Sequence, residues 1–178
     1  HGRAGEVHLQ SNLGSLHDAL VDRRIWVWAY FLEQAPQGRV PHRHLWTEEY
    51  NKLFIGVTQG ELIPFKSYYL TGFLNEKPLA ELRDDMQKLG IAKSDQVAEP
   101  EDHIAFLFEM MHGLIVGSFG RPSTIPEQNR FFENHIACWA PKFFENLETA
   151  EAARFFVPVG RIGKLFMEVE SEAFLIAA

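Results

Sequence analysis

The segment EPEDH (residues 99–103) gathers three carboxylates and one imidazole around a proline, directly before an apolar run. An imidazole next to a carboxylate can act as a general base beside the group that orients it. Adjacent residues of a helix point about 100° apart, however, so Asp102 and His103 would seldom bond each other directly. The residue types alone therefore allow acid–base catalysis but do not require it.

The same segment also fits the start of a helix. Acids in the first helical turn meet the positive end of the helix dipole, and proline is favoured there. This explains Glu99, Glu101 and Asp102 without any function. It does not explain His103, because an imidazole is unfavourable at that helix end unless a carboxylate such as Asp102 or Glu99 holds it. Capping, binding of a partner and catalysis remain three open interpretations.

The other candidates for chemistry are weaker. His42 and His44 lie two residues apart, and His135 precedes Cys138 by three. Neither pair brings the two further ligands of a convincing zinc site, so we expect no metal. Cys138 lies beside Trp139 among apolar neighbours, and we expect it to be a small buried filler rather than a nucleophile. The glycines do not follow a phosphate-binding pattern.

The composition limits the class of protein. The chain has 178 residues, 15 of them Phe and four Trp, which suits one domain with an aromatic core. Its formal net charge of -7 argues against nucleic acid and favours a cationic partner. No apolar run reaches the roughly 18 residues of a membrane span. One cysteine allows no intramolecular disulfide, so we expect a cytoplasmic protein without stable membrane insertion.

The spacing of apolar residues predicts an all-α fold of six or seven helices in a single domain, residues 1–178. Thr47 resembles an N-cap, Thr124 and Glu127 form a capping-box pattern, Pro141 should interrupt a helix and Pro158 should bend the last one. Residues 91–99 are expected to form a polar linker, and a junction between two subdomains is possible at residues 90–99. Helices are predicted over residues 13–31, 47–55, 78–90, 104–115, 124–147 and 149–174.

Four segments resemble one known family in the same order along the chain. EPEDHI (99–104) resembles the signature E-P-x-D-H-[IL] of the TorD/DmsD family, the cytoplasmic chaperones for molybdoenzymes of the dimethyl-sulfoxide-reductase type. EYNKLFIG (49–56) is similar to its D/E-Y-x-x-L-F-x-G element, and PFKSYYLTG (64–72) to its P-[YF]-x-S-x-Y segment. FFENHIACWAPKFFENL (131–147) resembles its F-[FY]-x-x-H-[LI]-x-x-W-x-x-x-F-[FI] helix. Each element alone is weak, but four in order are specific.

The resemblance runs from about residue 47 to the C-terminus, and the N-terminal 45 residues depart from the family pattern. It implies an all-helical, non-catalytic chaperone that binds the twin-arginine signal peptide, or the body, of a molybdoenzyme precursor. Such a chaperone delays export while the molybdenum cofactor is inserted. Carboxylates suit paired arginines, because arginine–carboxylate pairs can be bidentate, and aromatic surfaces suit the apolar part of the peptide.

Carried over by motif position, the expected partner-binding residues are Glu99, Pro100, Asp102, His103, Ser67, Tyr69, Gly72, His135 and Trp139. Each also has a structural alternative. Tyr69, His135 and Trp139 could belong to the core, Gly72 could be a turn residue and Ser67 could cap a helix.

The family also forms dimers by exchanging subdomains, so we expect a monomer or a domain-swapped dimer with the segment 91–99 as the hinge. Guanine nucleotide binding has been attributed to some members, but this sequence offers no support for it, and we expect no cofactor. Two other functions stay open. One is an accessory subunit of a respiratory molybdoenzyme complex, as in the related nitrate reductase delta group. The other is a small-molecule enzyme that uses Asp102 and His103.

Overall fold

The computed structural model describes residues 43–56, 59–93 and 98–177, with side chains from Thr47 onward. These ranges contain no β-strand, only one isolated bridge between Phe65 and His103, so the predicted all-α fold is confirmed. The α-helices are α2 (Arg43–Tyr50), α3 (Lys66–Thr71), α4 (Lys77–Leu89), α5 (Ile104–Val116), α6 (Ile125–Phe132), α7 (Ala140–Thr149) and α8 (Phe156–Ala177), with π-helical turns η1 (Asn51–Ile55) and η2 (Glu133–Ala137).

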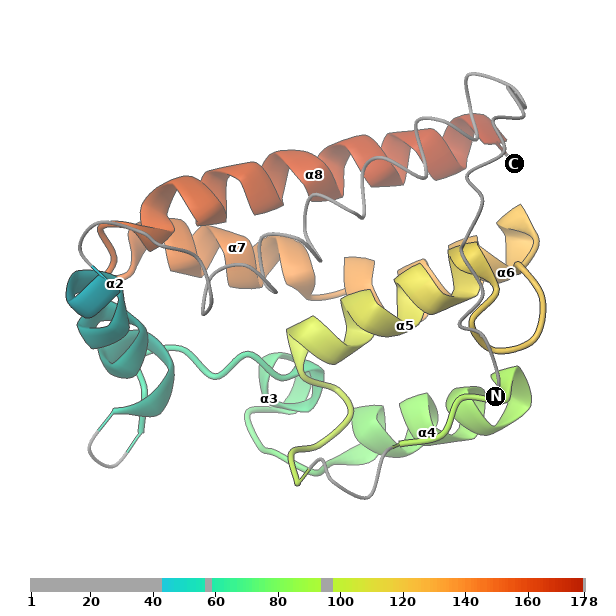
Figure 1. Cartoon of the computed structure of the whole chain (residues 1–178), viewed down its shortest axis with the longest axis horizontal. Coiled ribbons are helices and arrows are strands. Elements are labelled where there is room, and N and C mark those ends of the chain that lie inside the picture. The colour runs from blue at the N-terminus through green and yellow to red at the C-terminus, as the bar shows by residue number, and fades with distance from the viewer. Residues whose placement is uncertain (1–42, 57–58, 94–97, 178) are drawn as a thin grey trace, which may run out of the picture.

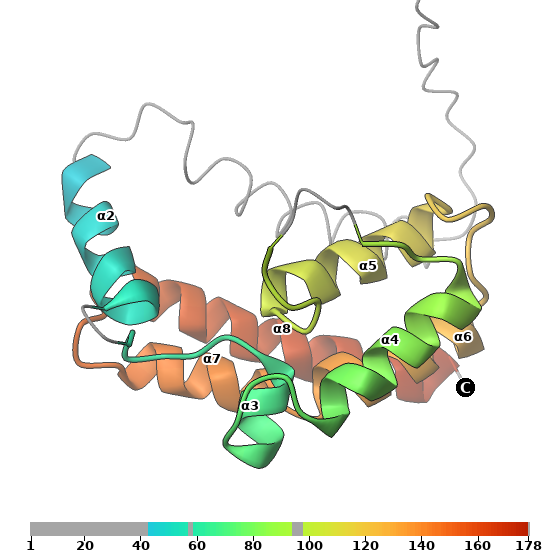
Figure 2. The ribbon, with the colours of Figure 1, turned by 90° about the horizontal axis from the view of Figure 1, so that it is seen from below.

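The helices pack around one aromatic and aliphatic core. Figure 1 shows α8 and α7 side by side above α5 and α6, with α4 below them, and α2 at the end of the molecule where α8 begins. Figure 2 shows the same pairing of α7 with α8 from a second direction. Each of α4, α5, η2, α7 and α8 contributes at least one buried side chain to the core, in that order Leu82, Leu107, Ile136, Phe144 and Met167. The apolar stripe predicted for residues 104–115 is part of this core.

The predicted start of the helix over residues 47–55 differs from the structure. The helix expected to begin at Thr47 already begins at Arg43, so Thr47 lies inside α2 and is not an N-cap. From Asn51 the helix widens into the π-helical turn η1, which ends at Gly56 with a positive φ of 65°. The helix predicted over residues 13–31 lies outside the described residues, as do the central residues 94–97 of the predicted linker.

The C-terminal helix was predicted over residues 149–174 with a bend at Pro158, and this is wrong in its first part. Helix α7 continues to Thr149, and α8 begins only at Phe156. Pro158 therefore lies in the first turn of α8. A proline N–H is not needed there, because the first backbone N–H groups of a helix have no partner within it.

Glu49 determines where α8 begins. Its carboxylate, only 9% exposed, accepts hydrogen bonds from the backbone N–H groups of Arg154 at 2.7 Å, Phe155 at 3.0 Å and Phe156 at 2.8 Å. A negative charge at this helix end is stabilised by the unpaired N–H groups and by the helix dipole. The first acid of EYNKLFIG is thus a cap for a helix more than 100 residues away.

The signals around α6 and α7 are confirmed. Glu127 accepts a hydrogen bond from the Thr124 backbone N–H at 2.7 Å, which is the capping-box contact. Hydrogen bonds from Arg121 and then from Thr124 lower the pKa of Glu127 to about 2. Pro141 stands in the first turn of α7, and the helical run breaks just before it.

Two glycines of α8 let it lie directly on α7. A Cβ atom added at Gly160 would be 2.8 Å from the carbonyl oxygen of Phe144, and one added at Gly163 would overlap the Phe144 ring. Any larger residue at either position would push the two helices apart. Among the described residues, no helix combines the length and the apolarity needed to cross a membrane.

Replacing Glu49 should destabilise the fold selectively. Glu49→Ala leaves three backbone N–H groups of the α8 start without their charged acceptor, and we expect a loss of roughly 2–4 kcal/mol in unfolding free energy. Urea denaturation followed by circular dichroism measures it. The neighbouring exposed residue gives the matched control, Glu48→Ala, which should stay within about 0.5 kcal/mol of the parent chain. Equal losses for the two variants would show that the Glu49 cap contributes nothing.

Candidate functional site

The two segments PFKS (64–67) and EPEDHI (99–104) lie against each other in the structure. The backbone N–H of Ile104 donates to the carbonyl of Pro64 at 2.9 Å, and that of Lys66 donates to the carbonyl of Asp102 at 3.0 Å. The Ser67 N–H donates to the Asp102 side chain, to Oδ2, at 2.7 Å. We call residues 64–67 and 99–104 together the signature junction. The structure thus brings together candidates that stand 35 residues apart in the chain.

Asp102 caps α3, not α5. Its side chain is fully buried, and its bond to the Ser67 N–H lies at the first turn of α3. Ser67 is equally buried and, instead of capping the helix with its own hydroxyl, donates its backbone N–H to that cap. Among the described residues, Asp102 Oδ1 and Ser67 Oγ have no hydrogen-bond partner. These two residues hold the junction from inside and do not reach its surface.

The prediction that the acids of EPEDH occupy the first turn of α5 is wrong. Helix α5 begins at Ile104 and has no acidic residue in its first turn. Glu101 instead binds Arg83 of α4, with Oε2 at 2.8 Å from Nη2 and 3.1 Å from Nε. Burial alone would raise the pKa of the Glu101 carboxyl, but the hydrogen bonds from Arg83 outweigh it and lower the pKa. Glu99 is exposed and Pro100 is half-buried.

His103 is the residue that caps α5. Its backbone is extended, and Nδ1 of its imidazole accepts a hydrogen bond from the Ala105 N–H at 3.1 Å. The ring packs edge-on against Phe65, with centroids 5.0 Å apart, and lies 5.7 Å from Phe106. Burial lowers the pKa of His103 although Glu99 and Asp102 act in the opposite direction. The expectation that a carboxylate must hold this imidazole is therefore corrected, because a neutral imidazole can itself accept the helix N–H.

Two aromatic candidates, Trp139 and Tyr69, lie at the start of α7, and Gly72 lies at the end of α3. Trp139 is a core residue whose indole Nε1–H donates to the His135 carbonyl at 2.9 Å. Tyr69 is half-buried, its ring centroid is 5.1 Å from that of Trp139, and its hydroxyl accepts a hydrogen bond from Asn146 at 3.2 Å. Gly72 ends α3 with a left-handed φ of 83° and is a turn residue.

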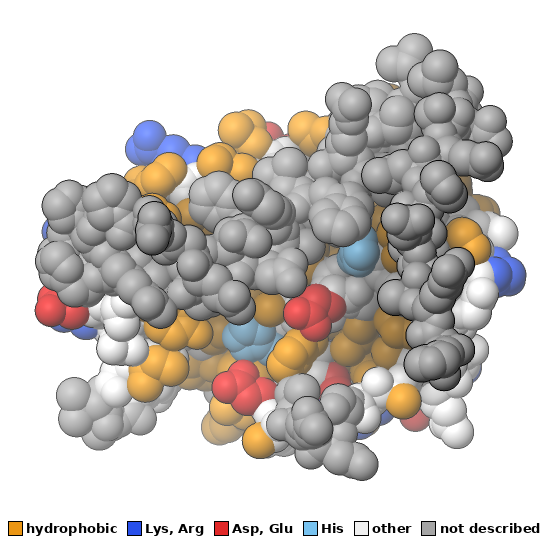
Figure 3. Space-filling model, in the orientation of Figure 1, with side chains coloured by type: hydrophobic (Ala, Val, Ile, Leu, Met, Phe, Trp, Pro, Cys, Tyr) orange, Lys and Arg blue, Asp and Glu red, His pale blue; other side chains and the backbone are white. Residues whose placement is uncertain are grey.

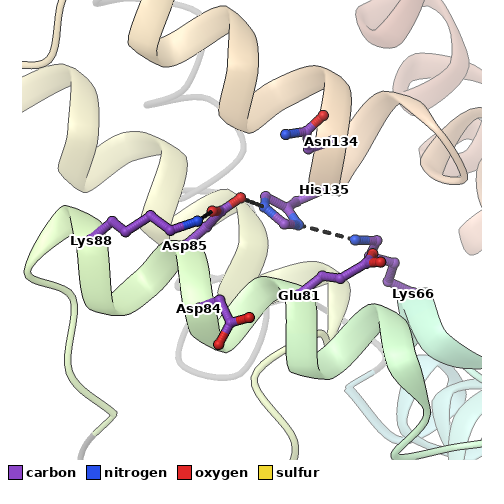
Figure 4. Close-up of a pocket in the computed structure, with 7 residues that line it drawn as sticks. All are labelled: Lys66, Glu81, Asp84, Asp85, Lys88, Asn134 and His135. Atoms are coloured by element: carbon purple, nitrogen blue, oxygen red, sulfur yellow. Dashed lines mark hydrogen bonds and ion pairs between the residues drawn. The ribbon is translucent and has the colours of Figure 1, made fainter.

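His135 is buried between two charged residues on different helices. Its Nδ1 lies 3.0 Å from Nζ of Lys66, and its Nε2 lies 2.9 Å from Oδ2 of Asp85, which Lys88 binds at 2.6 Å through Oδ1 (Figure 4). Beside this chain of contacts is a cleft of about 320 Å³. It is lined by Lys66, Glu81, Asp84, Asp85, Lys88, Asn134 and His135.

Lys66 joins the cleft to the signature junction, and sequence reasoning missed it. Its backbone pairs with Asp102 while its amine reaches His135. The signal was a lysine inside the otherwise apolar and aromatic stretch from Ile63 to Leu70. A lone lysine in such a stretch is either exposed or buried with a specific partner, and only the structure distinguishes these cases.

The prediction for Cys138 is wrong, and the histidine pairs give no metal site in the described structure. Cys138 is exposed rather than buried, and its Sγ donates to the Asn134 carbonyl at 3.3 Å. Among the described residues, no three His, Cys, Asp or Glu side chains are placed to hold a metal ion. His42 and the side chain of His44 lie outside the described part.

Comparison with known proteins defines the family. A family model described as nitrate reductase delta subunit matches residues 9–145. The chain belongs to this family. It is 26% identical over 131 residues to the chaperone protein TorD of Vibrio parahaemolyticus, which covers 69% of this chain and 61% of that protein. It is 28% identical over 131 residues to the chaperone protein TorD of Aliivibrio salmonicida, covering 68% and 60%.

The resemblance to the TorD/DmsD family is thereby confirmed, although the matched span differs from the expected one. The family model begins at residue 9, well before the first recognised element, and ends at residue 145 inside α7. The chain spans about three fifths of the length of these TorD relatives.

The neutral histidines should make the fold sensitive to acid. Burial lowers the pKa values of His103 and His135 from the ordinary 6.5, so the unfolded chain binds protons that the folded chain does not. The stability is complete above about pH 6.5 and falls as the pH drops through that value toward the lower folded-state pKa values. Urea midpoints at about pH 7.5 and about pH 5.5 measure the loss.

Two variants separate the cap from the titration. His103→Asn keeps an N-cap acceptor but cannot titrate, so it should reduce the pH dependence to the part due to His135, at little cost near neutrality. His103→Ala should lose about 1 kcal/mol at about pH 7.5 because the Ala105 N–H loses its acceptor. If His103→Asn has the same pH dependence as the parent chain, His103 does not titrate as described.

Proposed function

We propose that the protein is a cytoplasmic chaperone for a molybdoenzyme precursor, that it binds the precursor's twin-arginine signal peptide, and that it delays export during insertion of the molybdenum cofactor. Membership of the nitrate reductase delta subunit family and the TorD names of its relatives support the chaperone role. The observation that carries the peptide-binding part is the signature junction. It presents Glu99 and the rings of His103 and Phe65 on one structured turn.

The geometry favours binding over catalysis. Nδ1 of His103 is already occupied by the helix N–H, and the Asp102 carboxylate is buried on the far side against α3. A general base needs a free lone pair within reach of the substrate proton. This pair therefore does not have the arrangement of an acid–base centre, in agreement with the names of the relatives.

The candidate residues fall into two groups by exposure. Ser67, Asp102, His135 and Trp139 are buried, and in this proposal they hold the surface in place. The partner contacts come from the more exposed Glu99, Pro100, His103 and Tyr69, with Gly72 shaping the turn that ends α3. On the face seen in Figure 3, carboxylate and histidine side chains lie among exposed hydrophobic ones. Such a mixture suits a peptide that joins arginines to an apolar segment.

A second candidate is an accessory subunit that stays with the mature enzyme, which the family description, nitrate reductase delta subunit, favours. A pull-down distinguishes the two roles, because a chaperone captures the precursor without its cofactor and an accessory subunit captures the assembled enzyme. In either role we propose a monomer or a domain-swapped dimer with its hinge in residues 91–99.

Removing the Glu99 charge should weaken peptide binding. Titrating a twin-arginine signal peptide into Glu99→Gln should raise the Kd roughly two- to fivefold, the size expected for one exposed ion pair. The matched control is Glu172→Gln, which removes an exposed carboxylate from α8. It should bind like the parent chain, and binding by the parent should weaken with added salt.

The peptide supplies the second comparison. A version with both arginines replaced by glutamine should bind the parent chain more weakly and should not distinguish it from Glu99→Gln. Equal affinity for the two peptides would contradict the electrostatic part of the proposal. Equal affinity of the Glu99→Gln and Glu172→Gln variants for the arginine peptide would remove Glu99 from the site.

A further inference from the structure

Lys66 is a buried amine that makes no direct ion pair with a carboxylate of the described residues. Its side chain is 2% exposed, and among the described residues no carboxylate lies within ion-pair distance of Nζ. The amine contacts His135 Nδ1 at 3.0 Å instead. A buried ammonium without a counter-charge is unfavourable, so the neutral amine is favoured. Burial accordingly lowers the pKa of Lys66, although the nearby Cys138, Glu81, Asp102 and Asp85 act against it.

His135 is placed to act as the base for this amine. Asp85 accepts a hydrogen bond from Nε2–H, which leaves the Nδ1 lone pair directed at Lys66. Lys88 holds the other Asp85 oxygen at 2.6 Å and so fixes the carboxylate. Burial lowers the pKa of His135, so the imidazole is neutral and its Nδ1 lone pair is open to a proton. Lys66, His135 and Asp85 form the sequence of nucleophile, base and orienting group that activates nucleophiles in proteins.

The charges of the cleft beside Lys66, His135 and Asp85 determine which small molecules it favours. Figure 4 shows Glu81 and Asp84 on the α4 side and Asn134 on the η2 side of the same cleft that Lys66 and His135 line. With Lys66 neutral, three carboxylates face one ammonium, that of Lys88, so phosphate and carboxylate ligands are repelled. A volume of about 320 Å³ admits a small molecule. The cleft therefore suits a neutral electrophile that becomes cationic on reaction.

We propose that Lys66 is a nucleophilic lysine that takes small neutral aldehydes or ketones as imines in this cleft. The amine nitrogen forms a bond to the carbonyl carbon while the carbon–oxygen π bond breaks. His135 Nδ1 accepts a first proton from the nitrogen and passes it to the oxygen, which becomes a hydroxyl. The nitrogen lone pair then forms the second bond to carbon as the carbon–oxygen σ bond breaks. The second proton that the nitrogen loses, again carried by His135 Nδ1, turns the departing hydroxyl into water. The products are one imine and one water, and Glu81 and Asp84 stabilise its protonated form. The site is a stoichiometric covalent binding site and requires no turnover.

Reductive trapping with a small aldehyde tests the proposal. The folded protein is incubated near neutral pH with propanal and cyanoborohydride, and the alkylation rate of each lysine is measured by peptide mapping and mass spectrometry. Lys66 should be modified first, ahead of the exposed lysines Lys77 and Lys142. The advantage in reactive amine is about tenfold for each unit by which the pKa is lowered. Modification of Lys77 and Lys142 before Lys66 would overturn the proposal.

Variants test the role of the base. His135→Gln should slow alkylation of Lys66 severalfold and leave the rate at Lys77 unchanged, whereas Lys77→Arg should leave the rate at Lys66 unchanged. Lys66→Arg should remove the fast alkylation that we expect at position 66. Peptide mapping of the parent chain alkylated in concentrated urea tests whether the fold activates Lys66, even if a variant does not fold. There all lysines of the parent chain should react alike, and a Lys66 that reacts only under those conditions would show that the folded cleft does not activate it.

Discussion

The pairing of residues 64–67 with residues 102–104 is the contact on which the rest of the site depends. Two backbone hydrogen bonds and one bond to the buried Asp102 carboxylate fix the starts of α3 and α5 against each other. From that arrangement follow the position of His103 on the surface and the direction of Lys66 toward His135. A buried carboxylate is unfavourable unless it accepts hydrogen bonds, so the bond from the Ser67 N–H to Asp102 Oδ2 favours this geometry.

Carboxylates that cap distant segments recur through the structure. Glu49 binds the start of α8, and Glu61 accepts the N–H groups of Glu151 at 2.6 Å and Ala152 at 3.0 Å in the turn before it. In the signature junction, Asp102 likewise accepts a backbone N–H, while Glu101 is held by the Arg83 side chain. The acid of the signature junction that remains for a partner is the exposed Glu99.

Local patterns predicted local structure well and long-range contacts poorly. The apolar stripe of α5 and the capping box of Thr124 and Glu127 could be predicted, because the residues of each pattern lie only three to eleven positions apart in the sequence. The family motifs indicated which residues would form the site, but not which hydrogen bonds would join them. No period or spacing signals that a carboxylate caps a helix 35 or 105 residues away, so the roles of Asp102 and Glu49 were missed. The burial of Lys66 was hidden for the same reason, because its partner is 69 residues distant.

The two glycines of α8 also determine how this molecule can move. Gly160 lies against the backbone of α7 and Gly163 against the Phe144 ring, so the two helices are in close contact at both positions. Displacing α8 along α7 would bring side chains into these close contacts, so we expect the two helices to move as one unit. The side-chain hydrogen bonds that join α3 and α4 to their neighbours include those from Asn146 to Tyr69 and between His135 and Asp85, so we expect a rearrangement to begin at these contacts.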